Sequence, residues 1–576
     1  MLYTVIKKNL YKDSVNLMLL TNQLSTRSDL NQISVMMGTP ANKDIFNDAG
    51  LYTEDLEAAS PNDLCIVMDV DNKNVKVEIL AEIDDYLKNQ VSQSKKNIIP
   101  QARTWDTAMK KLPNANLAVI SISGEYVSEE TEKALDQGLN VFIFSDNVDI
   151  EDEVRLKQKA RERGLIVMGP DCGTGIFGDI PIAFANVVEQ GNIGVVGASG
   201  TGIQEITSII SRNGAGLTHA IGTGGRDLSS EVGAITTIES LSLLARDPNT
   251  EVLVYVSKPP APEVRHSVVE RFTGLGKPVV AVFMGEKPGK DHDNVQYTGT
   301  LEQAAFKAVE LAKQTSSDEN LNDMTPEIHK VRRQPNQRHL RGYYCGGTLA
   351  LETAMLLRET YGLEDDGNHS NGVMFYHGGS EIIDLGDDAY TKNRPHPMID
   401  PTLRLEKMRE AARDPDTAIV LLDNVIGYGG HDDMGGVFAQ AIKEEKRKAE
   451  NQGRAVVFIA SVTGTNADPQ GYEEQVEKLV EAGAIVKRSN AAASHLAIKI
   501  MQTIETNLTQ DKEKTAITTD RTPADELISE KPRIINIGLQ NFAVTVHEQN
   551  GDVIQFNWSP VAGGNRRLAT LLGNLK

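Results

Sequence analysis

The sequence is poor in the residues and segments that mark several classes of protein. Its three cysteines, Cys65, Cys172 and Cys345, lie far apart and form no CxxC pair. This spacing argues against a disulfide framework and a zinc site, and it fits reduced thiols in a cytoplasmic protein. No apolar run approaches the length of a membrane span. The opening segment, MLYTVIKKNLYKDSV, lacks the apolar centre and cleavage site of a signal peptide.

Positive charge is also scarce. The 576 residues contain 59 lysines and arginines against 80 aspartates and glutamates, a formal net charge of −21 at pH 7. Nucleic acids and anionic membranes bind basic surfaces that neutralise their phosphates, so the composition argues against both partners. The apolar content of 40% and the charged content of 24% are ordinary for a globular protein. The length predicts roughly three or four domains.

Strand and helix patterns alternate along the chain, which predicts an α/β fold with several doubly wound, mainly parallel sheets. Polar segments at 92–101, 315–338 and 505–530 read as linkers. They divide the chain into a small α/β domain at 1–92, further units at 103–190, 191–313 and 339–506, and a tail at 531–576. We expect the tail to be a small β-rich piece, with strands at 534–538, 542–547 and 553–556 and a final helix.

The segment GNIGVVGASGTG, residues 191–202, predicts a strand, a glycine-rich turn and a helix start. Such a turn brings backbone amides and the positive end of a helix close to an anion. It has neither the lysine of a P-loop nor the spacing of the dinucleotide fingerprint, and a tight turn that binds nothing remains open. The segment RGYYCGGTLALE, residues 341–352, repeats the pattern. The predicted anion-binding residues are Gly197, Ser199, Gly200, Thr201, Gly202, Gly346, Gly347 and Thr348.

Residues 104–313 resemble the α subunit of succinyl-CoA synthetases. The similarity rests on MGPDC (168–172), the turn at 191–202, IGTGG (221–225) and KPVVAV (277–282). Over the whole chain the sequence resembles the FdrA family, a branch of the same superfamily. The supporting segments are VMMGTPANK (35–43), RPHPMIDP (394–401), GYGGH (427–431), SVTGT (461–465) with DPQ (468–470), and the tail from NIGL (536–539) to AGG (562–564).

Succinyl-CoA synthetases form an acyl phosphate, pass its phosphoryl group through a histidine and bind CoA on a Rossmann-like domain. The resemblance therefore implies a Rossmann-like domain at 103–190 and two flavodoxin-like domains at 191–313 and 339–506. Two features depart from the pattern. No glycine-rich CoA loop precedes residue 116, and GKDHDNVQYT (289–298) stands where a Gly-His-Ala-Gly motif is expected. By register Gln296 takes the place of the histidine, and His292 lacks flanking glycines.

The resemblance to the FdrA family implies a subunit of an oxamate carbamoyltransferase. Such an enzyme moves a carbamoyl group between carbamoyl phosphate and oxamate, giving oxalurate and phosphate, in allantoin and purine catabolism. We expect it to work in a homo- or hetero-oligomer with partner subunits, without a cofactor or a metal. Direct attack by the oxamate nitrogen needs no histidine carrier, only donors for the phosphate and the carbonyl oxygen. An NDP-forming acyl-CoA synthetase and a non-catalytic scaffold remain alternatives.

His431 is the predicted catalytic residue, because a histidine after a strand and a glycine turn can polarise a carbonyl or transfer a proton. The alternative is that Asp432 or Asp433 caps the next helix and His431 packs beside it. Arg394 and His396, next to two prolines, are predicted to bind an anion, or the prolines simply fix a loop. Ordinary strand-to-helix turns are the alternative for the remaining predicted substrate-binding residues: Thr223, Gly224, Gly225, Gly429, Gly430, Thr463, Gly464 and Thr465.

Overall fold

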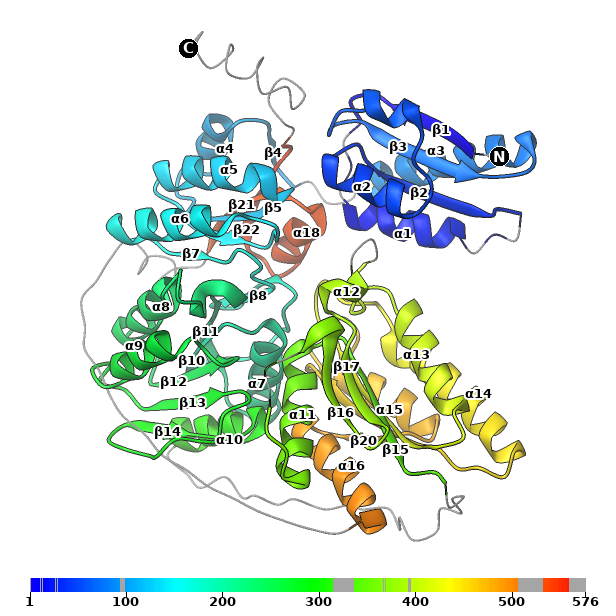
Figure 1. Cartoon of the computed structure of the whole chain (residues 1–576). Helices are drawn as coiled ribbons and strands as arrows, with labels where there is room; N and C mark the ends of the chain where they lie inside the picture. The colour runs from blue at the N-terminus through cyan, green and yellow to red at the C-terminus, as the bar shows by residue number, and fades with distance from the viewer. Residues whose placement is uncertain are drawn as a thin grey trace.

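The computed structural model describes residues 2–10, 12, 14–25, 27, 29–93, 99–313, 336–365, 367, 369–391, 395–505 and 532–558. These residues form four β-sheets with helices packed against them (Figure 1). One sheet is wholly parallel and two are mainly parallel, which confirms the expected α/β class. In the described residues, no helix combines the length and the apolar character that crossing a membrane requires.

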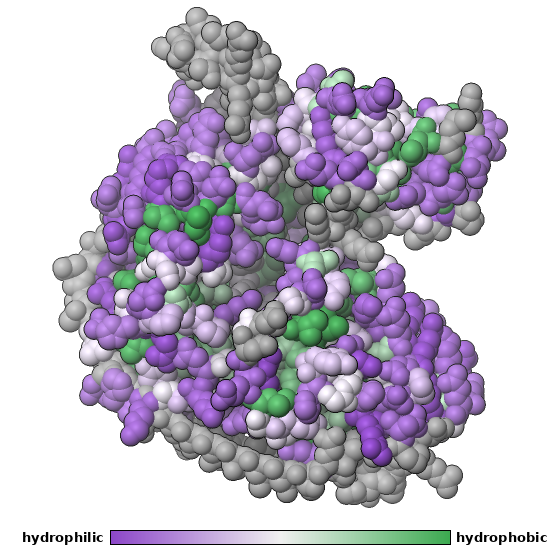
Figure 2. Space-filling model, in the orientation of Figure 1, coloured by the Kyte–Doolittle hydropathy of each residue, from purple (hydrophilic) through white to green (hydrophobic). Residues whose placement is uncertain are grey.

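The N-terminal domain is an antiparallel three-stranded sheet of order β1-β3-β2. Alternate residues of its central strand face two separate apolar clusters: Ile66 packs with Val35 on one face, and Cys65 packs with Phe46 on the other. On the face shown in Figure 2, a notch separates this domain from the part of the molecule that carries α13. Its elements are β1 (Leu2–Lys7), α1 (Ser14–Ser25), β2 (Gln32–Met37), α2 (Pro40–Asp48), η1 (Glu54–Ala58), β3 (Leu64–Asp69) and α3 (Lys73–Gln93).

The second sheet has six parallel strands in the order β4-β22-β21-β5-β6-β7. Two of them, β21 and β22, come from the tail of the chain, so the tail completes this sheet instead of forming a separate β-rich piece. Residues 542–547, expected as a strand, lie in helix α18. The elements are β4 (Gln101–Ala102), α4 (Trp105–Lys111), β5 (Leu117–Ser121), α5 (Gly124–Asp136), β6 (Asn140–Ile143), α6 (Ile150–Glu162), β7 (Val167–Met168), β21 (Arg533–Gly538), α18 (Gln540–Glu548) and β22 (Asp552–Phe556). The expected final helix lies outside the described residues.

Burial explains why β21 joins this sheet. Its residue Ile534 packs into the apolar cluster on one face, and Ile535 and Ile537 pack into the cluster on the other. A strand that is apolar on both faces needs helices on both sides of its sheet. The strand pairs with β5 from Ile534 opposite Leu117 to Gly538 opposite Ser121.

The third sheet has seven strands in the order β14-β13-β12-β10-β11-β8-β9. The hairpin β8–β9, expected in the preceding domain, forms its antiparallel edge by pairing with β11. The elements are β8 (Thr174–Phe177), β9 (Ile180–Ala183), β10 (Gln190–Gly197), α7 (Gly200–Arg212), β11 (Leu217–Gly222), η2 (Gly225–Leu228), α8 (Ile235–Arg246), β12 (Val252–Ser257), α9 (Pro262–Phe272), β13 (Val279–Phe283), β14 (Val295–Tyr297) and α10 (Leu301–Lys313).

The fourth sheet has six strands in the order β16-β17-β15-β18-β19-β20. As in the third sheet, the first parallel strand is central and the next two flank it, which is the expected flavodoxin-like order. The elements are β15 (His339–Tyr344), α11 (Gly347–Tyr361), η4 (Ser370–Gly372), β16 (Val373–His377), β17 (Ser380–Asp384), α12 (Asp388–Thr391), α13 (Thr402–Arg413), β18 (Thr417–Val425), α14 (Met434–Asn451), β19 (Val457–Thr463), α15 (Tyr472–Glu481), β20 (Ile485–Lys487) and α16 (Asn490–Glu505).

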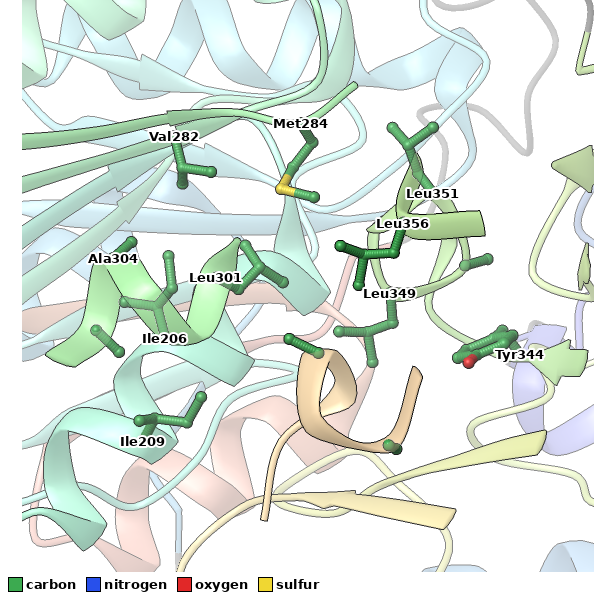
Figure 3. Close-up of a cluster of buried hydrophobic side chains, with 14 of the residues drawn as sticks. Ile206, Ile209, Val282, Met284, Leu301, Ala304, Tyr344, Leu349, Leu351 and Leu356 are labelled. Carbon is green, nitrogen blue, oxygen red and sulfur yellow. The ribbon is translucent and has the colours of Figure 1, made fainter. Parts of the chain in front are cut away.

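The two flavodoxin-like domains share one apolar core. Helices α7 and α10 contribute Ile206 and Leu301, and α11 contributes Leu349 and Leu356, all buried in one cluster (Figure 3). Helix α11 contacts α7 across this core. Because interiors are close-packed, the cluster fixes the start of α7 relative to the start of α11.

Candidate active site

The two glycine-rich helix starts face each other. Ser199 is the N-cap of α7, where its Oγ accepts the amide of Gly202 at 3.0 Å. The same Oγ lies 2.5 Å from Oγ1 of Thr348 in the first turn of α11. Gly346, the N-cap of α11, is so close to Thr201 that a Cβ there would lie 3.0 Å from its side chain. The structure thus brings the two predicted anion-binding turns together.

Some amides at these helix starts already have partners. The Asp423 carboxylate accepts the amides of Cys345 and Gly346, both at 3.0 Å. Asp423 is in turn paired with Arg404 at 2.5 Å, and both side chains are fully buried. The amides of Gly200 and Gly347 donate no hydrogen bond within the described residues, and both residues are only half-buried. Their free N–H groups make the paired helix starts suitable for an anion.

The carboxyl ends of three sheets meet around these helix starts, and we call this region the three-sheet junction. In the second sheet, Asp171 follows β7, and its Oδ2 lies 3.8 Å from where a Cβ on Gly225 would stand. In the third sheet, Thr223 directly follows β11, and its amide donates to the carbonyl of Gly197 at the end of β10 at 2.9 Å. The predicted residues Thr223, Gly224 and Gly225 therefore lie at the junction.

Two carboxyl groups at the junction have raised pKa values. Burial raises the pKa of Asp384 to about 6, against the opposing effects of the Gly386 amide and the charge of Lys258. Burial and the nearby charge of Asp146 raise the pKa of Asp171 to about 6, although solvent still reaches its side chain. Carboxyl groups with such pKa values can exchange protons near neutral pH.

His396 lies at the edge of the junction as a neutral side chain. A Cβ on Gly386 would lie 2.8 Å from its Nε2, and the ring stands 6.1 Å from Phe184. Burial and the charge of Arg404 lower the pKa of His396 to about 4. Its Nδ1 accepts the amide of Met398 at 3.2 Å, which assigns the proton to Nε2. His396 is therefore a hydrogen-bond donor at this place. Arg394 lies outside the described residues.

His431 contacts its own loop. Its Nδ1 accepts the amide of Asp433 at 3.0 Å, and its amide donates to the carbonyl of Met398 at 2.9 Å. Asp433 is the N-cap of α14, as in the second of the two interpretations above. The adjacent Gly429 packs closely against Phe184, and Gly430 continues the turn. These contacts explain the position of His431 without a catalytic role, and that role stays a prediction.

The threonines of the 461–465 segment are already engaged. Thr463 donates its hydroxyl to Glu205 at 2.5 Å, and Thr465 donates its hydroxyl to the carbonyl of Val187 at 2.6 Å. Gly464 between them packs against Ile426. These contacts join the two flavodoxin-like domains to each other, and a substrate-binding role for the segment stays a prediction.

The residues expected near a phosphohistidine lie elsewhere. Gln296 is in the edge strand β14, opposite Val280 early in β13, and not at the carboxyl end of the sheet. His292 forms a bridge with Val295 just before β14. Residues 284–294 connect β13 to β14 without a helix. Neither side chain is therefore placed to carry a phosphoryl group to the three-sheet junction.

The second sheet also has a reversal of its strand order. Its strand order reverses between β21 and β5, the point at which doubly wound sheets bind ligands. Gly538 ends β21 with φ of +113° and lies against the Ser121 carbonyl. The Ser121 hydroxyl accepts the amide of Leu539 at 2.9 Å, just before α18. The tail thus places a strand, a glycine and a helix start at this reversal point.

Comparison with known proteins gives the family. The chain is 40% identical over 503 residues to the uncharacterized protein YahF of Escherichia coli, across 86% of this chain and 97% of YahF. The chain belongs to the YahF family. Three family models match parts of this YahF-family chain: an AllF heavy metal-associated domain at 1–103, a CoA binding domain at 188–285 and a CoA-ligase at 343–500.

More distant relatives have named activities. The chain is 25% identical to succinate–CoA ligase subunit alpha 1 of Archaeoglobus fulgidus, over 40% of this chain and 81% of that protein. It is 26% identical to the sulfoacetate-CoA ligase subunit SauD of Bilophila wadsworthia, over 32% and 65%. The resemblance to succinyl-CoA synthetase α subunits is confirmed. A solved structure of an acetyl-coenzyme A synthetase from Ca. Korarchaeum cryptofilum aligns with 67% of this chain and 82% of that protein, at 14% identity and a TM-score of 0.24.

These findings correct the expected activity. The two relatives named above are subunits of CoA ligases and a CoA-ligase family model matches residues 343–500, so the prediction of a carbamoyltransferase acting on carbamoyl phosphate and oxamate is wrong. The N-terminal family model carries the name of a heavy metal-associated domain. In the described residues, no three His, Cys, Asp or Glu side chains gather in a way that would hold a metal ion, and Cys65 is fully buried.

Sequence reasoning missed the charged groups of the junction. Lys258 follows the predicted strand 252–256 by two residues, and Asp423 follows the predicted strand 418–422 directly. The signal that could have found them is a charged residue at the end of an apolar run, because carboxyl ends of parallel strands share one edge of a sheet. Asp384 ends β17, which sequence reasoning did not predict as a strand.

Proposed function

We propose that this YahF-family chain is the thioester-forming component of a ligase of the NDP-forming acyl-CoA synthetase type. In the reaction, the CoA sulfur bonds to the carbonyl carbon of an acyl phosphate. The bond from that carbon to the phosphate oxygen breaks, and the phosphate leaves with the electron pair and takes up the thiol proton. An acyl phosphate and CoA thereby give an acyl-CoA and inorganic phosphate.

The pair of facing helix starts carries this proposal. The leaving phosphate gains negative charge as the bond breaks, and preorganised N–H groups stabilise such charge. The unpaired amides of Gly200 and Gly347 come from opposite domains, and the hydroxyls of Ser199 and Thr348 lie between them. An acyl phosphate held there would have its phosphate at the positive ends of two long helices.

We place CoA at the reversal point between β21 and β5. This position combines the start of α18 with Gly538, which lies against the Ser121 carbonyl at the end of β21. The ring of Phe144 contacts residues of both the CoA position and the junction. Its centre lies 4.9 Å from that of Phe542 in α18 and 5.5 Å from that of Phe184, which lies beside His396. A ligand could therefore have its nucleotide on one sheet and its thiol beside the paired helix starts.

We assign formation of the acyl phosphate to a partner subunit. Neither His292 nor Gln296 reaches the junction, so the described residues offer no carrier on the β13–β14 connection. The succinate–CoA ligase and sulfoacetate-CoA ligase relatives are themselves named as subunits. An assembly with a nucleotide-binding partner accords with these names.

Arsenate-dependent cleavage of acyl-CoA tests the reaction in reverse. Purified full-length chain is incubated with arsenate and a panel of acyl-CoA esters, without nucleotide, and released CoA thiol is measured. Thr348→Val should lower the rate at least about tenfold by removing a donor beside the phosphate position. Thr273→Val, at an exposed threonine of the α9 C-cap, is the matched control. Cleavage that does not depend on arsenate, or equal rates in both variants, would contradict the proposal.

Binding of CoA tests the assigned crevice separately. Asn541→Asp adds a negative charge in the first turn of α18, which favours the helix but repels the diphosphate of CoA. Calorimetric titration should show CoA binding weakened at least about fivefold. Asn550→Asp, an exposed position beyond the other end of α18, should bind CoA like the original chain. Unchanged binding in Asn541→Asp would place CoA elsewhere.

A further inference from the structure

Lys258 occupies a ligand-binding position that no sequence motif identified. It directly follows β12, and β12 lies beside β10 on the side where the order of the seven-stranded sheet reverses. Ligands of doubly wound sheets bind outside the carboxyl ends of strands at such a reversal. The side chain is exposed, and within the described residues it forms no hydrogen bond or ion pair. An unpaired ammonium group thus stands at the three-sheet junction.

This ammonium group reaches the start of α11 in the other flavodoxin-like domain. Its Nζ lies 3.8 Å from where a Cβ on Gly347 would stand, and Oδ2 of Asp384 lies 2.5 Å from the same point. A cation at the positive end of a helix is electrostatically unfavourable by itself. Negative groups must therefore offset it, and the carboxylates of Asp384 and Asp171 both feel its charge.

The charged surroundings of the two carboxylates are defined by the packing. Asp384 faces Lys258, Asp387 and Asp423, and its Oδ1 accepts the Gly386 amide at 2.8 Å, close to neutral His396. The groups that act on Asp171 are Asp146, Asp388, Lys258 and Arg226. An anion that enters beside either carboxylate adds negative charge. Added negative charge favours the protonated carboxyl form, so anion binding and proton uptake are coupled.

We propose that Lys258 binds the phosphate group of the ligand at the three-sheet junction, and that Asp384 takes up a proton when the anion enters. The identity of the ligand as an acyl phosphate rests on the proposed function, whereas the anion site does not. Lys258 is the cation of this site, and Asp384 is the carboxylate with which the incoming anion competes for the start of α11. Gly347 leaves the space that both side chains use.

Sulfate is the probe, because it is a dianion that does not titrate near neutral pH. Calorimetric titration of the full-length chain with sulfate, from pH 8 to pH 6, should show affinity that rises as the pH falls. Lys258→Met should weaken sulfate binding at least about tenfold, since it removes a charge-assisted hydrogen bond, and Lys258→Arg should restore most of it. Lys290→Met removes an equally exposed lysine between β13 and β14 and should change nothing. Asp384→Asn should bind more tightly at pH 8 and lose much of the pH dependence.

Three results would overturn the inference: no sulfate binding by the original chain, equal binding in Lys258→Met, or wild-type affinity that does not change with pH. The outcome is separable from that of the proposed function. Sulfate binding with the predicted variant pattern, but without arsenate-dependent cleavage of acyl-CoA, would retain the anion site and reject the acyl phosphate. Arsenate-dependent cleavage of acyl-CoA without sulfate binding that depends on Lys258 would retain the proposed function and reject the anion site.

Discussion

Removing the charge of Asp423 should destabilise the fourth sheet more than removing the charge of Arg404. Both side chains are fully buried, and they are joined at 2.5 Å. Asp423→Asn leaves a buried guanidinium without a counter-ion, although it still donates to the carbonyls of Tyr343 and residue 423 and lies 4.6 Å from the centre of the Phe438 ring. Loss of one partner of a buried pair costs about 3–5 kcal/mol in free energy of unfolding. Arg404→Met leaves a carboxylate that still accepts two amides at the start of α11, so we expect about 2 kcal/mol.

Urea unfolding followed by far-ultraviolet circular dichroism is the assay. Tryptophan fluorescence would miss unfolding of the fourth sheet, because Trp105 and Trp558 both belong to the domain of the second sheet. The double variant Asp423→Asn with Arg404→Met should be more stable than Asp423→Asn alone, since no unpaired buried charge remains. A loss below about 1 kcal/mol in Asp423→Asn would refute the reasoning, and so would a double variant less stable than both single ones.

Three further predictions concern stability. Leu349→Ala opens a cavity in the core shared by α7 and α11 and should cost about 2–5 kcal/mol in urea unfolding, whereas the exposed Leu363→Ala should stay within about 0.5 kcal/mol; equal losses would contradict the shared core. Because the pKa of His396 is lowered in the folded chain, the unfolded chain takes up a proton first, and the free energy of unfolding falls by at most about 3 kcal/mol as the pH drops from about 6.5 to about 4. His396→Asn should lack this loss. Curves of stability against pH that run parallel for the original chain and the variant would contradict the prediction. Lys157→Met leaves the buried carboxylates of Glu153 and Asp227 without their shared cation and should cost about 3 kcal/mol, measured by thermal unfolding, while Lys157→Arg should recover part of it.

Most strands could be predicted from short apolar runs, and the two glycine turns could be predicted from local pattern. The tail shows where this approach fails. Residues 542–547, FAVTVH, are rich in strand-forming residue types, yet they form the helix α18. The deciding contacts come from far away in the chain, because Phe542 packs on Phe144 and β21 pairs with β5. Tertiary packing overrides local propensity when a segment completes a distant sheet.

The candidate site shows the same division. Ser199 and Thr348 were each predicted from their own turn, but no local pattern states that their hydroxyls meet across 149 residues of sequence at 2.5 Å. Lys258 and Asp384 belong to different sheets and approach the same point beside Gly347. Their partnership could not be predicted, since it depends on how two domains pack and not on spacing along the chain.

The sequence by itself determined the α/β class, the succession of strands and helices and the two glycine-rich helix starts, because these depend on residue types within a few positions of one another. Only the tertiary structure decided that the tail completes the second sheet, that three sheets turn their carboxyl ends toward one junction, and that the charge of Lys258 acts on two carboxylates there. Those relations come from burial of apolar faces and from charge pairs between distant segments. Their energies arise only when the whole chain is packed.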